Sequence, residues 1–211
     1  MAGMPDDTKN RRRSAEERRE DLMDAAVVVM SARGVAAATT RAIAEEAGVP
    51  QGVFHYCFRS RDELVTALFE REITRSSDRT SGALRRFSDV DRGIRAALEA
   101  QLDLVRSGPT YYLAMAELSL TVLRTPDGPP LAVWEQEQYR SRAQAGLEAW
   151  SAEHGLVWSV PLAHVASFLV AVGAGVTGTW LADRDDAQAE AALGVAAQAL
   201  GSLAGSAGTP T

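Results

Sequence analysis

A tight break separates two very short helical segments near residue 50. Proline removes a backbone donor and disfavours a helical conformation in the residue before it, so Gly48-Val49-Pro50 ends a helix. The segment before the break runs from Thr40 to Ala47 and has Thr39 as its expected N-cap. The segment after it runs from Gln51 to Cys57. Two short helices joined by a tight turn containing glycine are the signature of a helix-turn-helix unit.

Longer helices are expected on both sides of this pair. Ser14-Ala15-Glu16-Glu17 is a capping box, and the apolar residues from Leu22 to Met30 that follow it have helical spacing. Gly34 then ends that helix. Ser60-Arg61-Asp62-Glu63 is a second capping box, and it opens a helix with Leu64, Val65, Leu68 and Phe69 on one side.

The rest of the chain also has helical patterns, and no alternating strand pattern or internal repeat is present. The segment 74–91 is polar, and we place a domain boundary near Arg75. The later helices are expected around Ile94 to Val105, then at Tyr111–Arg124, Leu131–His154, 161–182 and Ala187–Leu203. The fold class predicted is therefore all-α, with domains at 14–75 and 76–204, a flexible basic tail at 1–13 and a disordered tail at 205–211.

Composition and charge exclude little. The formal net charge is −6, with most of the acidic excess in the C-terminal part, so the chain as a whole does not attract a polyanion. Local clusters such as Arg11-Arg12-Arg13 still can. A single cysteine, Cys57, excludes an internal disulfide and a thiolate-rich zinc site, and it suits a reducing cytoplasm.

The segment 161–182 has no formal charge and is long enough to cross a membrane. It also contains His164, Ser167 and three glycines, and it has no basic anchor on either side. A largely buried helix of a soluble bundle has the same composition, and that reading is preferred to a membrane span.

The stretch QGVFHYCF divides by helical phase into two sets of residues. Phe54 and Phe58 are expected to anchor the second short helix to the core. The residues expected to point outward together are Gln51, Gly52, Val53, His55 and Tyr56. A helix exposed in this way can enter the major groove of DNA with its N-terminus first.

The block from Thr39 to Leu64 resembles the DNA-binding domain of the tetracycline-repressor family of bacterial regulators. The matching pieces are TTRAIAEEAGV, QGVFHYCF and SRDEL, and the resemblance covers about residues 14–75. It implies a three-helix DNA-binding domain joined to a larger helical ligand-binding and dimerisation domain. It also implies a cytoplasmic, non-enzymatic regulator that needs no cofactor.

The resemblance implies a role for individual residues. Thr40 and Arg41 lie where the family contacts phosphates and, through the arginine, a base, and Thr39 lies beside them. His55 replaces a tyrosine, and Arg61 a lysine, that contact phosphate, and both replacements keep a hydrogen-bond donor. The base-reading face implied is Gln51, Gly52, Val53 and Tyr56. Cys57 departs from the usual His or Tyr, so the family's sequence preference does not transfer.

Other chemistry has weaker support in the sequence. Cys57 has no evident general base, and His55 and Cys57 diverge on the helix, so a small semi-buried residue is the better reading than a nucleophile. The scattered histidines supply too few ligands for a metal site. Arg11-Arg12-Arg13 is either a solvated tail or an arm for the minor groove.

The C-terminal part is expected to supply a homodimer interface and an effector pocket. Small residues and an apolar stripe on the last two helices suggest a four-helix contact between copies, formed by Ser167, Gly173, Ala174, Gly178, Leu193, Ala197 and Leu200. The alternative is that both helices are core of one subunit. The pocket is expected at Tyr111, Met115, Trp134 and Phe168, within a wider aromatic set that includes Tyr112, Tyr139, Trp150 and Trp180. Without the resemblance, ordinary core packing would be the better interpretation of these aromatic residues.

The function predicted is a homodimeric repressor that binds double-stranded DNA at a pseudo-palindromic operator and is released by a small molecule. The alternatives are an enzyme or a membrane-anchored regulator on the same helical scaffold. No nucleophile–base pair supports the enzyme, since Glu117, His154 and His164 lie far apart in the sequence.

Overall fold

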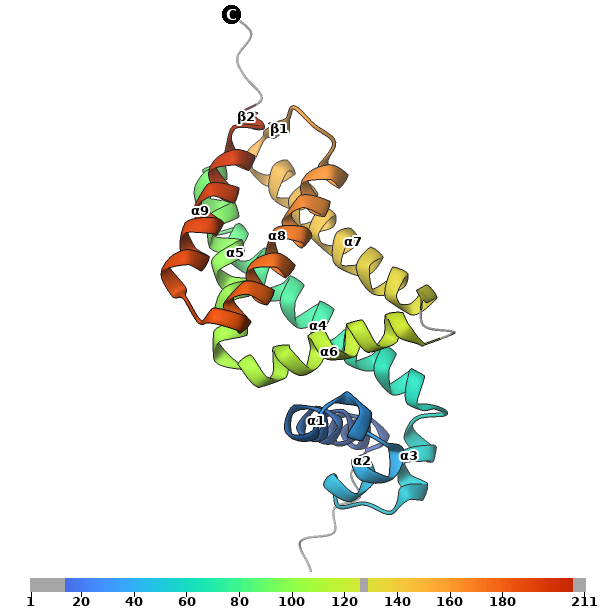
Figure 1. The fold of residues 1–211 in the computed structure, drawn as a ribbon. Helices are drawn as coiled ribbons and strands as arrows, with labels where there is room; N and C mark the ends of the chain where they lie inside the picture. The colour runs from blue at the N-terminus through green and yellow to red at the C-terminus, as the bar shows by residue number, and fades with distance from the viewer. Residues whose placement is uncertain (1–13, 126–128, 207–211) are drawn as a thin grey trace, which may run out of the picture. The chain divides into compact units, whose positions relative to one another are not determined.

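The structure is a computed structural model that describes residues 14–125 and 129–206. Within these ranges the chain forms nine α-helices, one 3₁₀ turn and two short strands (Figure 1), so the predicted all-α class is confirmed. The Arg11-Arg12-Arg13 cluster lies outside the described residues.

The chain divides into two compact units, and the division falls after Leu68. Helix α4, Arg61–Leu84, is continuous across that point. The boundary expected near Arg75 lies later in the same helix. The polar segment that begins at Thr74 continues this helix as far as Leu84.

The first unit contains α1 (Ala15–Arg33), the 3₁₀ turn η1 (Val35–Ala37), α2 (Thr40–Glu46), α3 (Gln51–Cys57) and the start of α4. Both halves of the Ser14/Glu17 capping box are present at the start of α1. Gly48 has φ of 66°, a left-handed conformation that favours glycine, at the turn between α2 and α3. Helices α1, α2 and α3 contact one another around an apolar core formed by Leu22, Ala26, Val29, Ile43, Phe54, Phe58 and Leu64.

The second unit contains the remainder of α4 with α5 (Val90–Ser107), α6 (Pro109–Arg124), α7 (Pro129–His154), α8 (Leu162–Asp183) and α9 (Asp186–Gly201). Its core is centred on Trp150, which is fully buried and donates its indole N–H to the Phe87 carbonyl at 2.8 Å. A Cβ on Gly93 would lie 2.6 Å from the Trp150 ring, so this glycine permits the close approach of α5 to α7.

Two three-residue strands correct the expectation of a strand-free chain with a disordered tail from residue 205. Leu156–Trp158 (β1) pairs antiparallel with Ala204–Ser206 (β2). The Ser159 amide and hydroxyl both bond to the Leu203 carbonyl beside this pair. Elements of three residues are too short for an alternating pattern to be recognisable in the sequence.

Candidate nucleic-acid interface and effector cavity

Helix α3 has one buried and one exposed face, as the phase of its residues predicts. Phe54 and Phe58 are fully buried, whereas Gln51, Gly52 and His55 are exposed. Tyr56 is the most exposed large hydrophobic side chain of the described residues, at 73%. Val53 was expected to face outward, but it is half-buried rather than exposed. The exposed face of α3 therefore offers amide, imidazole and phenol groups from one short helix.

The start of α2 lies beside this face. Thr39 caps α2, because its hydroxyl accepts from the Ala42 amide at 3.1 Å. The Gln51 side-chain amide donates to the Thr40 hydroxyl at 3.4 Å, which links the first residues of α2 and α3. Arg41 follows with an exposed side chain. A cation and several hydrogen-bond donors thus gather at the N-termini of two helices, an arrangement suited to phosphate oxygens.

Arg61 is already engaged within the protein. Its guanidinium donates to the carbonyls of Val35 and Ala38, both at 3.2 Å, and its side chain is half-buried. These bonds tie the start of α4 to the turn before α2. Arg61, which was expected to bind phosphate, therefore stabilises the fold through these two hydrogen bonds. No pattern in the sequence indicates this role.

Arg19 holds the C-terminal end of α3 in place. Its guanidinium donates to the Cys57 carbonyl, lies 4.2 Å from the centroid of the Phe58 ring and pairs with Glu63 at 3.1 Å. Cys57 itself is buried rather than semi-buried, and it is a free thiol. The C-terminal end of α3 is thus fixed by a residue of α1 that the sequence analysis did not single out.

The Glu63 carboxylate completes this network. It accepts from the Arg59 amide at 2.8 Å, and this bond, followed by the one from Arg19, lowers the pKa of Glu63. The Ser60 hydroxyl accepts from the Glu63 amide at 3.1 Å, as a capping box requires. The return bond goes to the Arg59 amide rather than to that of Ser60. Glu63 is therefore a satisfied, structural carboxylate.

The second unit contains a partly open cavity of about 480 Å³ among α4, α5, α6, α7 and α8. Much of its wall is apolar, formed by Leu84, Ile94, Leu98, Leu120, Leu147 and Leu169. Its polar lining includes Ser76 and Gln101, whose side chains are hydrogen-bonded to each other. A largely apolar cavity with a few polar groups is the usual form of a small-molecule site.

Two carboxyl groups are buried in this cavity wall. Glu72 is 2% exposed and Glu135 is 5% exposed. Burial raises the pKa of both, because the charged form loses its hydration. The Tyr111 hydroxyl donates to Glu72 Oε2 at 2.8 Å, and the Ser119 hydroxyl bonds to Glu135 Oε1 at 2.9 Å. Among the described residues, Glu72 Oε1 has no hydrogen-bond partner.

Only one of the four residues expected to line the pocket does so. Met115 is in the cavity wall, together with Tyr112 and Tyr139 of the wider aromatic set. Tyr111 instead supports Glu72 through its hydroxyl. Trp134 is half-buried outside the lining, and Phe168 is 44% exposed. The sequence reasoning missed the buried acids because it searched for aromatic residues.

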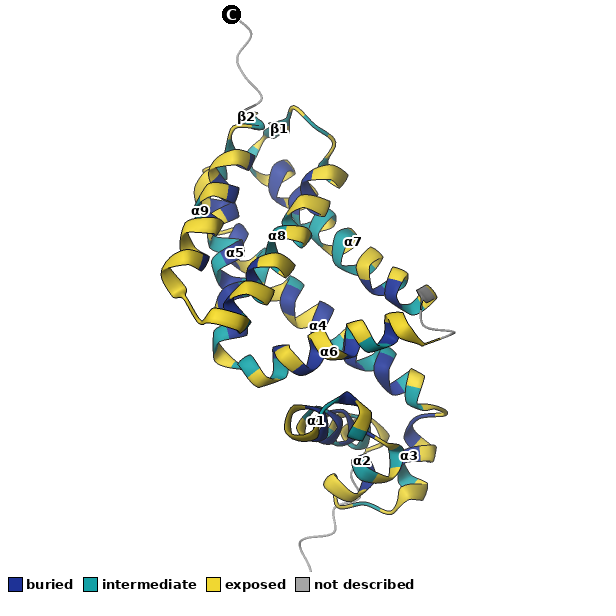
Figure 2. Ribbon diagram, in the orientation of Figure 1, coloured by how far each residue is buried: buried dark blue, intermediate teal, exposed yellow. Residues whose placement is uncertain are grey.

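The residues expected at a dimer contact have three different settings within the single chain. Leu193, Ala197 and Leu200 are buried in the core of their own unit, which is the alternative that the sequence left open. Gly173, Ala174 and Gly178 line the cavity, and Ser167 is exposed on α8. Figure 2 shows that much of the surface of α8 and α9 is nevertheless exposed.

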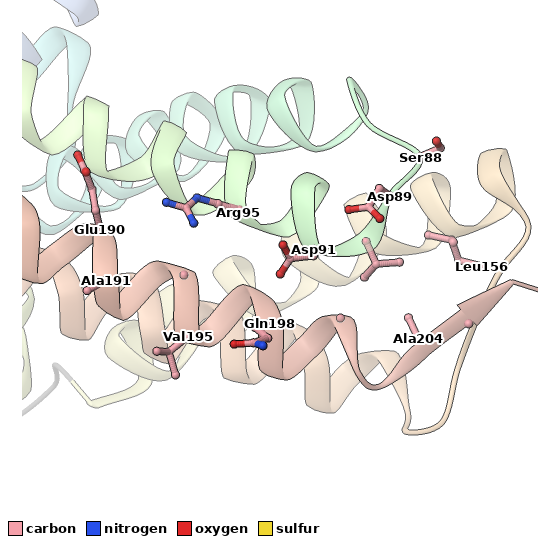
Figure 3. A pocket seen from close by; sticks show the side chains of 14 residues that line it. Ser88, Asp89, Asp91, Arg95, Leu156, Glu190, Ala191, Val195, Gln198 and Ala204 are labelled. Carbon is pink, nitrogen blue, oxygen red and sulfur yellow. The ribbon is translucent and has the colours of Figure 1, made fainter.

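A second hollow runs along α5 and α9 (Figure 3). It is larger, at about 900 Å³, but it lies open on the surface. Asp89, Asp91 and Arg95 line one side and Glu190 and Gln198 the other. Arg95 is paired with Glu99 at 2.8 Å. Because this groove lacks a buried polar group and an enclosing apolar wall, the smaller cavity is the better candidate for an effector.

Residues 14–125 and 129–206 contain no group of three or more His, Cys, Asp or Glu side chains placed to hold a metal ion. In the same ranges, one helix, α8, is long and apolar enough to cross a membrane by length and composition alone.

Comparison with known proteins assigns the first unit to a family. Residues 22–68 match the model for bacterial regulatory proteins of the tetR family. No curated protein has a significantly similar sequence.

Solved structures match nearly the whole chain. The multidrug binding protein EbrR, solved with imidazole, is 26% identical over 94% of this chain and 97% of its own, with a TM-score of 0.65. A TetR transcription regulator from Haloarcula marismortui is 19% identical over 90% of this chain and 100% of its own, with a TM-score of 0.70. The fatty acid degradation regulator FadR from Bacillus halodurans is 15% identical over 90% and 97%, also with a TM-score of 0.70.

These matches agree with the geometry of both units. The family match covers the helix-turn-helix and the start of α4, and the structural matches extend the same fold through the second unit. The family consists of regulators rather than enzymes. The protein is therefore a DNA-binding transcriptional regulator of the TetR family.

Proposed function

We propose that the protein is a cytoplasmic, homodimeric repressor that binds a pseudo-palindromic operator and is released by a small molecule held in the cavity of its second unit. The observation that carries this proposal is the combination, in one chain, of an exposed α3 face and a largely apolar cavity with buried acids. The first gives DNA contact, and the second gives a site for an effector.

The proposed DNA contacts come from α2, α3 and the start of α4. Arg41 contacts phosphate and a base, and Thr39, Thr40 and His55 contact the backbone. Gln51, Gly52, Val53 and Tyr56 form the base-reading face, which is supported by the exposure of three of these four residues. Arg61 contacts phosphate only through the donors that its two bonds to Val35 and Ala38 leave over.

The proposed dimer is supported by the exposure of α8. This helix has a mean hydropathy of 1.7 in its most apolar window, yet only 17% of that window is buried within the chain. The exposed residues of α8 and α9 are mostly small or apolar, and they include Ala163, Phe168, Ala171, Gly175, Ala191, Ala192 and Val195. A second copy packed across a two-fold axis would cover these surfaces as a four-helix bundle.

The proposed release by a ligand requires two states of the dimer. A ligand changes DNA affinity only if it binds the DNA-competent and incompetent states with different affinity. We propose that the two states differ in the spacing of the DNA-binding units. Dimers with a helix-turn-helix read half-sites about 34–36 Å apart, so a change in spacing weakens binding.

Selection of bound duplexes from a random DNA pool tests the function. The expected result is one enriched pseudo-palindromic sequence with half-sites about one helical turn apart. Enrichment of a single half-site would contradict binding as a dimer. Failure to enrich any sequence would contradict the proposal that the protein recognises a specific operator.

A charge on α8 tests the dimer. Ala171→Arg should convert the dimer to a monomer in sedimentation experiments, because the arginine would be buried without a partner. Ala149→Arg, on an exposed position of α7, is the matched control. The alternative is that the exposed face of α8 contacts a membrane instead of a second copy. In that case the full chain would be recovered only with detergent.

A further inference from the structure

The cavity of the second unit contains more acid than its own surroundings neutralise. Glu72 and Glu135 line it and are almost fully buried, while Arg142 is its one basic lining residue and is exposed. Arg71 and Arg75 act on Glu72 from the same helix, but burial outweighs their effect. A buried carboxylate without a close cation is costly, so this arrangement needs an explanation.

The polar partners of Glu72 among the described residues leave one of its carboxylate oxygens without a hydrogen bond. Glu72 Oε2 accepts from Tyr111, but its Oε1 is buried with no hydrogen-bond partner in the described ranges. The Tyr112 hydroxyl favours the charged form of Glu72, although it makes no hydrogen bond of ordinary geometry. An ionised carboxylate only accepts, so the unused atom calls for a donor or a positive charge.

The aromatic rings place both acids in one electrostatic environment. Burial raises the pKa of the Tyr139 phenol, and the charges of both Glu72 and Glu135 raise it further. Tyr112 and Tyr139 also line the cavity. Tyrosine rings attract cations through their faces, and a cation would be stabilised by rings and carboxylates together.

We propose that the cavity binds an amphipathic organic cation, whose positive nitrogen is held by Glu72 and Glu135 and whose apolar body lies against the wall formed by α5, α6 and α8. This inference rests on the proposed function, because it gives the chemical class of the effector. The ligand supplies the counter-charge that the wall lacks. Its apolar part fits the leucines and isoleucine of the lining.

An anionic or neutral ligand fits the same wall less well. An anion would place a third negative charge beside two carboxyl groups, and Arg142, at the exposed edge, is the single lining residue that favours it. A neutral apolar ligand would leave Glu72 Oε1 unpaired and remove the remaining hydration of the carboxylates. The cation is the ligand class that improves the environment of both acids.

Calorimetry on the free, full-length protein tests the charge requirement. Benzyltrimethylammonium is the cationic probe, and neopentylbenzene is its neutral counterpart of the same shape. Phenylacetate is the anionic comparison. The expected result is that the cation binds at least about tenfold more tightly than either of the others.

Two isosteric variants test the residues. Glu72→Gln and Glu135→Gln should each weaken binding of the cation by about ten- to a hundredfold, the range expected when a buried charged partner is removed. Affinity for neopentylbenzene should stay unchanged or increase. Glu153→Gln, an exposed residue of α7 outside the cavity, is the matched control. Circular dichroism confirms that each variant is folded.

Two outcomes would overturn the proposal. One is equal or tighter binding of the neutral or anionic probe, and the other is unchanged cation affinity in both folded glutamine variants. Since DNA is absent, these outcomes are independent of the operator selection. Binding of the cation without any effect on DNA would leave the ligand class standing and contradict release by a ligand.

Discussion

Glu63 and Glu72 lie on the same helix, α4, and have opposite environments in the two units. The Glu63 carboxylate accepts from the Arg59 amide and pairs with Arg19, and these bonds lower its pKa. Glu72 is buried in a cavity wall with one oxygen unpaired, and burial raises its pKa. The same residue type thus supports the shape of the first unit and remains unsatisfied in the second.

The difference separates structural from functional polar groups. In the first unit, no buried side-chain nitrogen or oxygen of the described residues is without a partner, and the exposed face of α3 is left for DNA. In the second unit, three buried side-chain atoms of the described residues have no partner, and two of them, Glu72 Oε1 and the Tyr112 hydroxyl, belong to residues of the cavity wall. The third, His154 Nε2, belongs to a residue outside that wall. A small molecule in the cavity can reach the first two. A buried group without a partner costs stability and is retained where a ligand completes it.

Removal of Arg19 should have the largest effect on the first unit. Arg19→Ala loses the pair with Glu63, the bond to the Cys57 carbonyl and the contact with the Phe58 ring. We expect a loss of about 1–3 kcal/mol in the free energy of unfolding and weaker DNA binding through a displaced α3. Denaturant unfolding and fluorescence anisotropy measure the two effects. Arg33→Ala, on the same helix and exposed, should change neither strongly.

Arg41→Ala should weaken DNA binding without changing stability. Its side chain is exposed, so its loss should lower affinity about tenfold at fixed salt and reduce the salt slope by about one. Anisotropy titrations at several salt concentrations give both numbers. Arg92→Ala, at an exposed position of α5, is the control. Wild-type affinity and slope in Arg41→Ala would remove this residue from the interface.

Neutralising the two glutamates should shift stability in opposite directions at neutral pH. Glu72 has a raised pKa, so its ionisation costs stability as pH rises, and Glu72→Gln should be stabilising by an amount on the order of 1 kcal/mol. Glu63 has a lowered pKa, so its ionised form stabilises, and Glu63→Gln should be destabilising.

Both differences should shrink in acid. The difference for Glu72 shrinks first, because its raised pKa is reached first, and that for Glu63 is lost only as the pH falls through its lowered pKa. Denaturant unfolding at neutral pH, near about pH 4 and near about pH 3 measures them. A destabilising Glu72→Gln at neutral pH would mean that this carboxylate is satisfied by the protein, and the comparison between the two glutamates would fail.

Filling the cavity should have the smallest effect on the fold. A Cβ on Gly173 meets no atom within 4 Å, and this glycine lines the cavity. Gly173→Leu should raise stability by up to about 1 kcal/mol through helix propensity, and it should weaken ligand binding. Gly82 is on α4, outside the cavity, and a Cβ there also meets no atom within 4 Å, so Gly82→Leu should raise stability without changing ligand binding. Dissociation of the dimer in Gly173→Leu would instead place this glycine at the contact between copies.

The sequence predicted the first unit closely because its signals are local. The bounds of α3, Gln51–Cys57, follow from Pro50 before it and from the spacing of Phe54 and Phe58. Ser14 and Thr39 cap the helices that they were expected to cap. The bonds from Arg61 to Val35 and Ala38 were not predictable, because they join residues brought together only by the tertiary fold.

The second unit was predicted at the level of helices and less well at the level of its site. The stripe Leu193, Ala197 and Leu200 is apolar in the sequence, but the sequence does not indicate whether its own core or a second copy covers it. Glu72 did leave a signal, since it continues the buried face of Val65 and Leu68 at helical spacing. An acidic residue on the apolar face of a helix therefore indicates a buried carboxyl group.

One measurement tests the division of work between the two units most directly: titration of benzyltrimethylammonium onto the complex with the selected operator, for wild type and Glu72→Gln. We expect both proteins to bind the operator equally well without the cation, and only the wild type to be released by it. Release of Glu72→Gln at the same concentration, or a loss of its operator affinity before any ligand is added, would contradict this account.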